Sequence, residues 1–292
     1  MNRLSELVWR FIKDNYGDPK KINELSGVNK GRGTSCVRLL FEKTSVIVKN
    51  TVYRREYDVY NHVTSFFYSK KIHIPNTYYT YNEEKSYWFV IEDIPLSFSK
   101  TRWKGDTEQI KYLFTLHSNT WNQNLNINEP FIFQWSKSLD NKALKLLPVD
   151  LKTVIEDLRI ASKDIFSQLC CISGDPNPTN WGMRNNNQLV LFDWERIGYG
   201  FPAIDLAIII PGLGTTDKSL ETHIANTYLN FWKATSISFP YSTSELIQQI
   251  TVAKIWSVLD FIVNNADTLE KQTLELIVKQ LSNKLEYEHV TL

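Results

Sequence analysis

The chain is poor in cysteine. Its 292 residues include three cysteines, Cys36, Cys170 and Cys171. An odd, low count with one adjacent pair provides no disulfide framework, and no C-x-x-C spacing offers a metal site. The sequence therefore predicts a reducing, cytoplasmic compartment.

Net charge and long apolar runs are also scarce. The formal net charge is +1, from 33 Lys and Arg against 32 Asp and Glu. Nucleic-acid and membrane-surface binders usually carry a basic excess, so we expect neither partner. Residues 1–17 lack the apolar core of a signal peptide, and we expect no run of membrane-spanning length. The sequence leaves the oligomeric state open.

Three polar residues of the stretch 170–207 are candidates for a catalytic or metal-binding role. Asp175 and Asn180 form the spacing D-x-x-x-x-N, in a loop that intervening prolines keep from being helical. After the turn-forming run 185–187, a short apolar strand, 189–192, leads to Asp193. A solvated hairpin with turn-forming Asp and Asn is the alternative.

This set of polar groups is the one that kinase-type phosphoryl transfer uses. One carboxylate accepts the proton of the attacking hydroxyl, while the amide oxygen and the second carboxylate hold Mg²⁺ against the nucleotide phosphates. The D-x-x-x-x-N spacing is that of a kinase catalytic loop.

An upstream segment has the arrangement of a kinase ion pair. Residues 45–49 predict a strand of β-branched residues that ends in Lys49, and 53–63 predict a helix that carries Glu56. A solvated strand end is the alternative for Lys49, and the short connection leaves the pairing with Glu56 open.

A glycine-containing turn precedes this strand. Gly31 and Gly33 give flexible backbone, and Thr34 and Ser35 add hydroxyls before the extended run 36–41. Such a turn can fold over phosphates and offer backbone N–H groups, although a plain hairpin turn has the same composition. It is not a Walker loop, because no G-K-[ST] opens a helix.

The motif SGDPNPTNWG, followed by LVLFDWERIGYGFPAIDLA, resembles the catalytic core of aminoglycoside phosphotransferases and choline-kinase-like small-molecule kinases. The resemblance implies Asp175 as catalytic base and Asn180 and Asp193 as metal ligands. It also implies Asp205 as a brace for the catalytic loop, with Glu195 as a further candidate for a second metal.

The resemblance extends, more weakly, to the N-terminal part. It implies that Lys49 binds the α- and β-phosphates with Glu56 as its partner, and that residues 31–35 cover the phosphates. Backbone groups of Ile91, Glu92 and Asp93 would bind the adenine edge.

Two positions qualify the resemblance. Ser173 stands where the family usually has a histidine that acts mainly as a hydrogen-bonded post, so local rigidity is in question more than activity. His117 lies on an otherwise apolar helix face, in YLFTLHSNTW, and we interpret it as a buried, hydrogen-bonded histidine. No A-P-E motif follows Asp193, which argues against a protein kinase.

We therefore expect an α+β, bilobal protein-kinase-like fold. Residues 1–95 would form a nucleotide-binding lobe with a small antiparallel sheet, and 96–292 a larger helical lobe that binds the acceptor. With ATP and Mg²⁺, the enzyme would phosphorylate a hydroxyl of a small molecule of the aminoglycoside type. A metabolite kinase of the choline, homoserine or methylthioribose type, or a nucleotide-binding pseudokinase, is the alternative.

Hydrophobic periodicity predicts the other elements. The expected strands are 22–28, 76–81 and 86–92. The expected helices are 4–16, 107–121 with Asp106 as N-cap, 139–147, 150–169, 219–232, 244–263 and 268–285.

Overall fold

The structure is a computed structural model that describes residues 4–25, 34–137, 139–213, 217–265, 267 and 269–291. The chain forms two compact units. Unit 1 comprises Met1–Phe98, Asn124–Phe131 and Thr179–Ile197, and unit 2 comprises Ser99–Gln123, Ile132–Pro178 and Gly198–Leu292. The division into lobes 1–95 and 96–292 stays a prediction, because compact packing alone does not say which parts move as one body.

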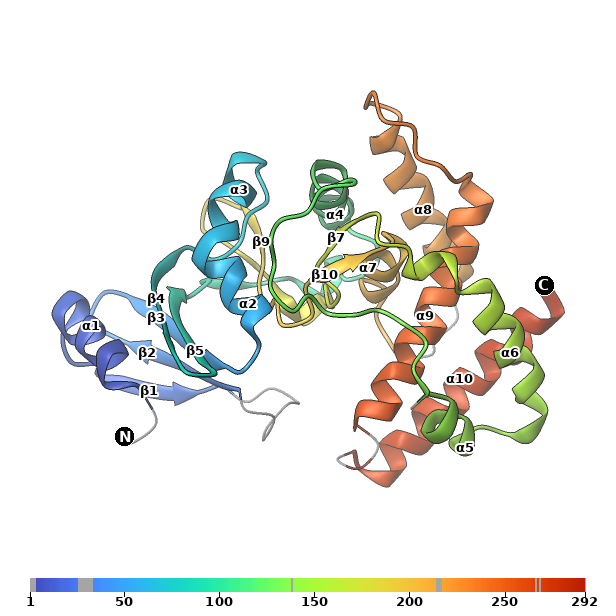
Figure 1. Cartoon of the computed structure of the whole chain (residues 1–292), viewed down its shortest axis with the longest axis horizontal. Helices are drawn as coiled ribbons and strands as arrows, with labels where there is room; N and C mark the ends of the chain where they lie inside the picture. Colours follow the sequence, from blue (N-terminus) through green and yellow to red (C-terminus); the bar gives the residue numbers. More distant parts are fainter. Residues whose placement is uncertain are drawn as a thin grey trace. The chain divides into compact units, whose positions relative to one another are not determined.

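Unit 1 is built on a five-stranded antiparallel sheet with the strand order β1-β2-β3-β5-β4 (Figure 1). Its strands are β1 (Lys21–Glu24), β2 (Ser35–Leu40), β3 (Ser45–Thr51), β4 (Thr77–Glu83) and β5 (Ser86–Glu92). Its helices are α1 (Glu6–Tyr16), α2 (Arg54–Asp58), the π-helix η1 (Val59–Val63) and α3 (Thr64–Ser69). A small second sheet has the order β6-β8-β9, formed by β6 (Leu96–Ser97), β8 (Trp181–Met183) and β9 (Leu189–Leu191).

The two faces of the five-stranded sheet are covered by different helices (Figure 1). Side chains alternate along a strand, so Val46 and Val48 of β3 point to one face, where they pack with Val8 and Ile12 of α1. Lys49 is thereby directed to the opposite face, which α2 and η1 cover.

Unit 2 is mainly helical. Its α-helices are α4 (Thr107–Asn119), α5 (Leu144–Leu146), α6 (Lys152–Ala161), α7 (Ala203–Ile208), α8 (Lys218–Trp232), α9 (Thr243–Asn265) and α10 (Lys271–Thr291). Shorter turns are η2 (Lys100–Arg102), η3 (Leu139–Ala143), η4 (Val149–Leu151) and η5 (Asp164–Phe166). A two-stranded antiparallel pair joins β7 (Cys170–Ile172) to β10 (Gly198–Gly200). The α+β class expected from the sequence is confirmed.

Two sequence-based expectations for unit 2 were wrong. The helix expected over 150–169 ends at Ala161, and a 3₁₀ turn, Asp164–Phe166, follows it. Ile165 is buried in that turn, so the apolar spacing continues although the helix does not. The second is the expectation that no run has membrane-spanning length, because α9 is long and apolar enough to cross a membrane. In the structure, 67% of its most apolar window is buried inside the protein, as in a core helix.

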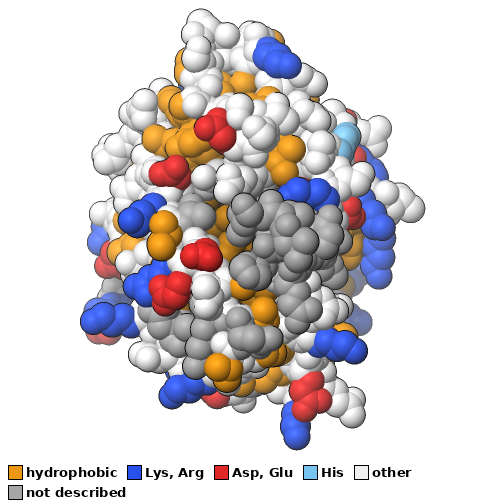
Figure 2. All heavy atoms as spheres, turned by 90° about the vertical axis from the view of Figure 1, so that its right-hand side faces the viewer, with side chains coloured by type: hydrophobic (Ala, Val, Ile, Leu, Met, Phe, Trp, Pro, Cys, Tyr) orange, Lys and Arg blue, Asp and Glu red, His pale blue; other side chains and the backbone are white. Residues whose placement is uncertain are grey.

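The core between α8, α9 and α10 contains charged side chains. Lys284 Nζ donates to Glu221 Oε1 at 2.9 Å, and Thr251 Oγ1 donates to Glu221 Oε2 at 2.6 Å. Lys254, also buried, donates to the carbonyl oxygen of Ile210. Away from this core, acidic and basic side chains are interspersed on the face drawn in Figure 2, in keeping with the near-zero net charge.

Burial makes stability depend on pH through Lys254. Burial, reinforced by the charge of Lys284, lowers the pKa of Lys254 from 10.5 to about 7. Between these values the unfolded chain binds the proton and the folded chain does not. We therefore expect the free energy of unfolding to rise with pH across this window, by up to ~1.4 kcal/mol per pH unit from this group.

Urea unfolding at pH 7.5 and 9 measures this slope. Lys254→Met should flatten it, because methionine has no proton to release. An equal slope in wild type and variant would contradict the assignment.

Candidate functional site

Lys49 is the centre of an ion-pair cluster in unit 1. Its Nζ lies 2.6 Å from Glu56 Oε1 on α2 and 2.6 Å from Asp193 Oδ1. Burial alone lowers the pKa of Lys49, but the two carboxylates outweigh it and hold that pKa well above its usual value. The lysine therefore stays charged at neutral pH.

Asp193 and Asn180 are brought together by the β8–β9 hairpin. Trp181 of β8 pairs with Leu191 of β9, so the residues just before β8 and just after β9 lie at the same end. The N–H of Phe192 donates to the carbonyl oxygen of Asn180 at 3.0 Å. Both predicted metal ligands are thus at one end of this hairpin.

The backbone around Asp193 is fixed in an unusual conformation. Asp193 has a φ of 65°, in the left-handed region that aspartate tolerates better than most residues. The next residue, Trp194, is fully buried, donates from Nε1 to the carbonyl oxygen of Leu191 at 3.2 Å, and packs on Phe67. This anchor holds the Asp193 carboxylate toward Lys49.

The carboxylates in this cluster suit a divalent cation. Oxygens of Glu56, Asp193 and Glu195 lie within 4.8 Å of one another, and carboxylate oxygens are the ligands that Mg²⁺ prefers. Glu56 Oε2 is buried and has no hydrogen-bond partner among the described residues, which leaves an oxygen that a cation would satisfy. The resemblance implied Glu195 as a further candidate for a second metal, and its role stays a prediction.

The phosphate-loop residues are only partly described. Gly31 and Gly33 lie outside the described residues. Thr34 directly precedes β2, and Ser35 is its first residue. Ile91 lies within the ladder of β5. The roles of all five stay predictions.

The other two residues proposed to contact adenine make side-chain pairs within unit 1. Glu92 bonds Arg184, with Nη2 at 2.6 Å from Oε2, and its N–H donates to the carbonyl oxygen of Asn76 at 2.9 Å. Asp93 Oδ1 accepts from Arg38 Nη2 at 2.9 Å. The N–H of Glu92 is therefore already engaged, and the contact with adenine stays a prediction for this segment.

Asp175 lies in unit 2, in the loop after β7, and is half-buried. Its Oδ1 accepts from Asn177 Nδ2 at 3.0 Å, and its N–H donates to Ser173 Oγ at 3.4 Å. Gly174, just before it, has a φ of 77°, a conformation that glycine adopts at no steric cost. This turn sets the direction in which the Asp175 side chain leaves the loop.

The loop is braced by Asp205, the residue that the resemblance implied. Its carboxylate accepts from the N–H of Ser173 at 2.9 Å and from the N–H of Gly174 at 2.8 Å. Asp205 is fully buried near the start of α7, where charge-assisted hydrogen bonds are strong.

His117 completes this network from α4. Its Nε2 lies 3.1 Å from Asp205 Oδ2 and its Nδ1 lies 3.0 Å from the hydroxyl of Tyr228. Because an ionised carboxylate only accepts, Nε2 carries a hydrogen. The interpretation of His117 as a buried, hydrogen-bonded histidine is confirmed.

Ser173 is 3% exposed, so we expect Ser173→His to crowd the loop and reduce stability by ~1–3 kcal/mol, the usual cost of overpacking. Ser173→Ala, which removes only the long bond to Asp175, should change stability by less than ~1 kcal/mol. Thermal unfolding of both variants tests this. A wild-type melting temperature for Ser173→His would show that the loop has room for an imidazole.

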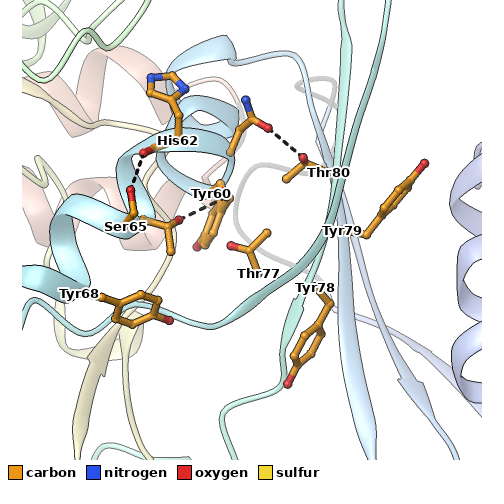
Figure 3. A pocket seen from close by; sticks show the side chains of 10 residues that line it. Tyr60, His62, Ser65, Tyr68, Thr77, Tyr78, Tyr79 and Thr80 are labelled. Carbon is orange, nitrogen blue, oxygen red and sulfur yellow. Dashed lines mark hydrogen bonds between the residues drawn. The ribbon is translucent and has the colours of Figure 1, made fainter.

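A separate groove of unit 1 is lined by residues of η1, α3 and β4 (Figure 3). Tyr60, Tyr68, Thr77 and Tyr78 are among its hydroxyl-bearing side chains. It contains none of the predicted site residues, so we do not include it in the candidate site.

No family model matches the chain, and no curated protein sequence matches it significantly. Solved structures do. A spectinomycin phosphotransferase in complex with ADP and spectinomycin matches over 100% of this chain and 99% of its own, at 12% identity and a TM-score of 0.64. The choline kinase LicA from Streptococcus pneumoniae matches over 97% and 98%, at 15% identity and a TM-score of 0.59.

A third structure extends this likeness. It is an aminoglycoside phosphotransferase in ternary complex with AMP-PNP and hygromycin B, and it matches over 97% of this chain and 98% of its own, at 11% identity and a TM-score of 0.60. The chain has the protein-kinase-like fold of small-molecule kinases. The fold predicted from the Asp175–Asp205 motif is thus confirmed over nearly the full length.

Proposed function

We propose that the chain is an ATP-dependent phosphotransferase that transfers the γ-phosphate of ATP to a hydroxyl of a small molecule. The acceptor class we favour is an aminoglycoside-type antibiotic or a related amino or hydroxy compound. The observation that carries the proposal is the cluster of Lys49 with Glu56 and Asp193, on a fold whose solved relatives were crystallised with ADP or AMP-PNP.

The residues of unit 1 would bind the nucleotide. Lys49, held by Glu56, would neutralise charge on the phosphates. Phosphoryl transfer requires little of the protein beyond positioning and electrostatic stabilisation. Asn180 and Asp193 would hold Mg²⁺, which supplies charge neutralisation on the phosphate oxygens when bound. Because Lys49 already bonds both carboxylates, its ammonium is fixed before nucleotide arrives.

Asp175 would accept the proton of the attacking hydroxyl. Its Oδ1 is oriented by Asn177 Nδ2, and its loop is fixed through Asp205. A fixed base lowers the barrier because the hydroxyl and the carboxylate need not find each other in solution.

The remaining parts of the proposal follow from composition. Three unpaired thiols fit a reducing compartment, so we propose a cytoplasmic enzyme. We propose a small-molecule acceptor as its partner, without nucleic acid or membrane.

Release of ADP from Mg-ATP tests the proposal. The acceptor panel contains aminoglycosides, spectinomycin, choline, ethanolamine, homoserine and methylthioribose, with Asp175→Asn as control. Turnover with one acceptor that is lost in the variant would support both reaction and acceptor class. Turnover only with choline, homoserine or methylthioribose would favour a metabolite kinase. Mg-ATP binding without turnover on a broadened panel would favour a pseudokinase, and absence of Mg-ATP binding would refute the kinase proposal.

A further inference from the structure

Residues 124–131, which we call the strap, pack as part of unit 1. They follow α4 in the sequence but contact the helical segment that carries Glu56. Three residues of that segment bond the strap: Arg55 to the carbonyl oxygen of Glu129, Asp58 to Asn128, and His62 to the carbonyl oxygen of Asn126. The strap is thereby bonded to this helical segment at three positions.

The bonds of Asp58 are the strongest of these contacts. Its Oδ2 accepts from the backbone N–H of Asn128 at 2.7 Å and from Asn128 Nδ2 at 2.9 Å. Asp58 is 3% exposed, and a buried carboxylate binds its donors tightly because water does not compete. His62 Nδ1 lies 3.9 Å from the other carboxylate oxygen of Asp58, Oδ1.

Helix α2 is the first part of a continuous helical run that η1 and α3 extend over residues 54–69. It has five residues, its N-cap Tyr53 makes no side-chain cap bond, and it passes at Val59 into the π-helix η1. A change to π geometry marks a local departure from the regular hydrogen-bond ladder of a helix. Asp58, the last residue of α2, is bonded to the strap at this change of register.

Two residues of the strap, Ile127 and Phe131, fix it within unit 1. Ile127 is buried, and the N–H of Phe131 donates to the carbonyl oxygen of Ile197 at 2.9 Å. The Arg55 guanidinium lies 5.5 Å from the ring of Phe131, a cation–π distance, and its Nε donates to the carbonyl oxygen of Glu195. Arg55 thus joins the strap to the segment that follows Asp193.

We propose that Asp58 is a positioning residue and that the strap, through it, holds Glu56 within reach of Lys49. Glu56 and Asp58 are two residues apart on α2. The first bonds Lys49 at 2.6 Å and the second bonds the strap. The part that concerns nucleotide binding rests on the proposed function. The part that concerns the position of helix α2 is independent of the proposed function.

The test uses Asp58→Ala, Asn128→Ala and the double variant in the full-length chain. Mg-ATP affinity is measured by calorimetry, and amide hydrogen exchange is measured over 54–63 without nucleotide. We expect Asp58→Ala to weaken Mg-ATP binding about tenfold and to speed exchange over 54–63. Asn128→Ala, which removes only the Nδ2 bond, should shift both readouts in the same direction by less. The double variant should be no weaker than Asp58→Ala, because Asp58→Ala already removes both bonds.

Asn61→Ala is the matched control. Asn61 lies in η1, and its Oδ1 accepts from Thr80 Oγ1 of β4 at 2.9 Å rather than from the strap. It should change Mg-ATP affinity less than about twofold. If Asp58→Ala does not fold, Asn128→Ala, which keeps the backbone N–H donor, replaces it.

The outcomes separate this inference from the proposed function. Unchanged Mg-ATP affinity and unchanged exchange in folded Asp58→Ala would overturn the inference. If wild type binds no Mg-ATP, the proposed function fails, and exchange alone decides: faster exchange over 54–63 in Asp58→Ala supports the strap as the support of α2, and unchanged exchange refutes it.

Discussion

Replacing Asp175 by asparagine is expected to lower kcat for phosphoryl transfer by ~10²–10⁴-fold, the usual contribution of a positioned general base. Asparagine retains an oxygen that can accept from Asn177 Nδ2, as Asp175 Oδ1 does at 3.0 Å, so the loop should keep its conformation. It cannot take up the proton of the acceptor hydroxyl. Steady-state release of ADP, with the acceptor identified by the panel, measures the change.

The affinity for Mg-ATP should stay within about threefold of wild type in this variant, because nucleotide binding is assigned to other residues. Asp164→Asn, a change of an exposed carboxylate in the same unit, is the matched control and should leave kcat unchanged. A kcat for Asp175→Asn within a few-fold of wild type would remove Asp175 as the base.

Replacing Asp205 by alanine is expected to reduce the free energy of unfolding by ~3–5 kcal/mol, as when one partner of a buried charged network is lost. The variant leaves the N–H groups of Ser173 and Gly174, and Nε2 of His117, without their acceptor in a fully buried position. Each unpaired buried donor carries its own desolvation cost. Urea unfolding followed by tryptophan fluorescence measures the loss.

Asp157→Ala, in the exposed face of α6, controls for removal of a carboxylate and should change stability by less than ~0.5 kcal/mol. Loss of less than ~1 kcal/mol in Asp205→Ala would mean that water or a local rearrangement satisfies the three donors.

The sequence was most informative where chemistry and local structure coincide. Asp175, Asn180 and Asp193 stand at fixed spacing around prolines and a short apolar strand, so their loop and hairpin could be predicted from neighbouring residues alone. The strands β3 and β5 were predicted for the same reason, since β-branched and aromatic residues in short runs favour extended structure. The Asp106 N-cap, which accepts from the N–H groups of Glu108 and Gln109, was predicted from local sequence too.

Long-range contacts could not be predicted in this way. The bond between Asp58 and Asn128 joins positions 70 residues apart, and nothing in the composition of a polar loop indicates which helix it contacts. Lys254 lies in the apolar helix α9 and Lys284 in α10, and neither helix's own sequence indicates that its lysine is buried. Lys284 is paired with Glu221 from a third helix, and Lys254 donates to the carbonyl oxygen of Ile210.

Local geometry could not be predicted from the sequence where the spacing of apolar residues was misleading. Ile165 keeps the spacing of α6, so one helix was expected to continue to residue 169, whereas the chain turns after Ala161. The π-helix Val59–Val63 was read as ordinary helix, because one additional residue per turn is not visible in a pattern of this length.

The three thiols make the two units separately observable. Burial raises the pKa of Cys36 to about 11, and raises those of Cys170 and Cys171 further above the usual range, so none is a reactive thiolate at neutral pH. Cys36 lies on β2 opposite Lys49, while the other two form the start of β7 ahead of the Asp175 loop. Cys170 and Cys171 are buried whereas Cys36 is partly exposed, so the rate at which a thiol reagent modifies the β7 pair reports the opening of that strand's neighbourhood. The chain thus carries native probes that can time the local opening of β7, ahead of the Asp175 loop, separately from changes around Cys36 on β2.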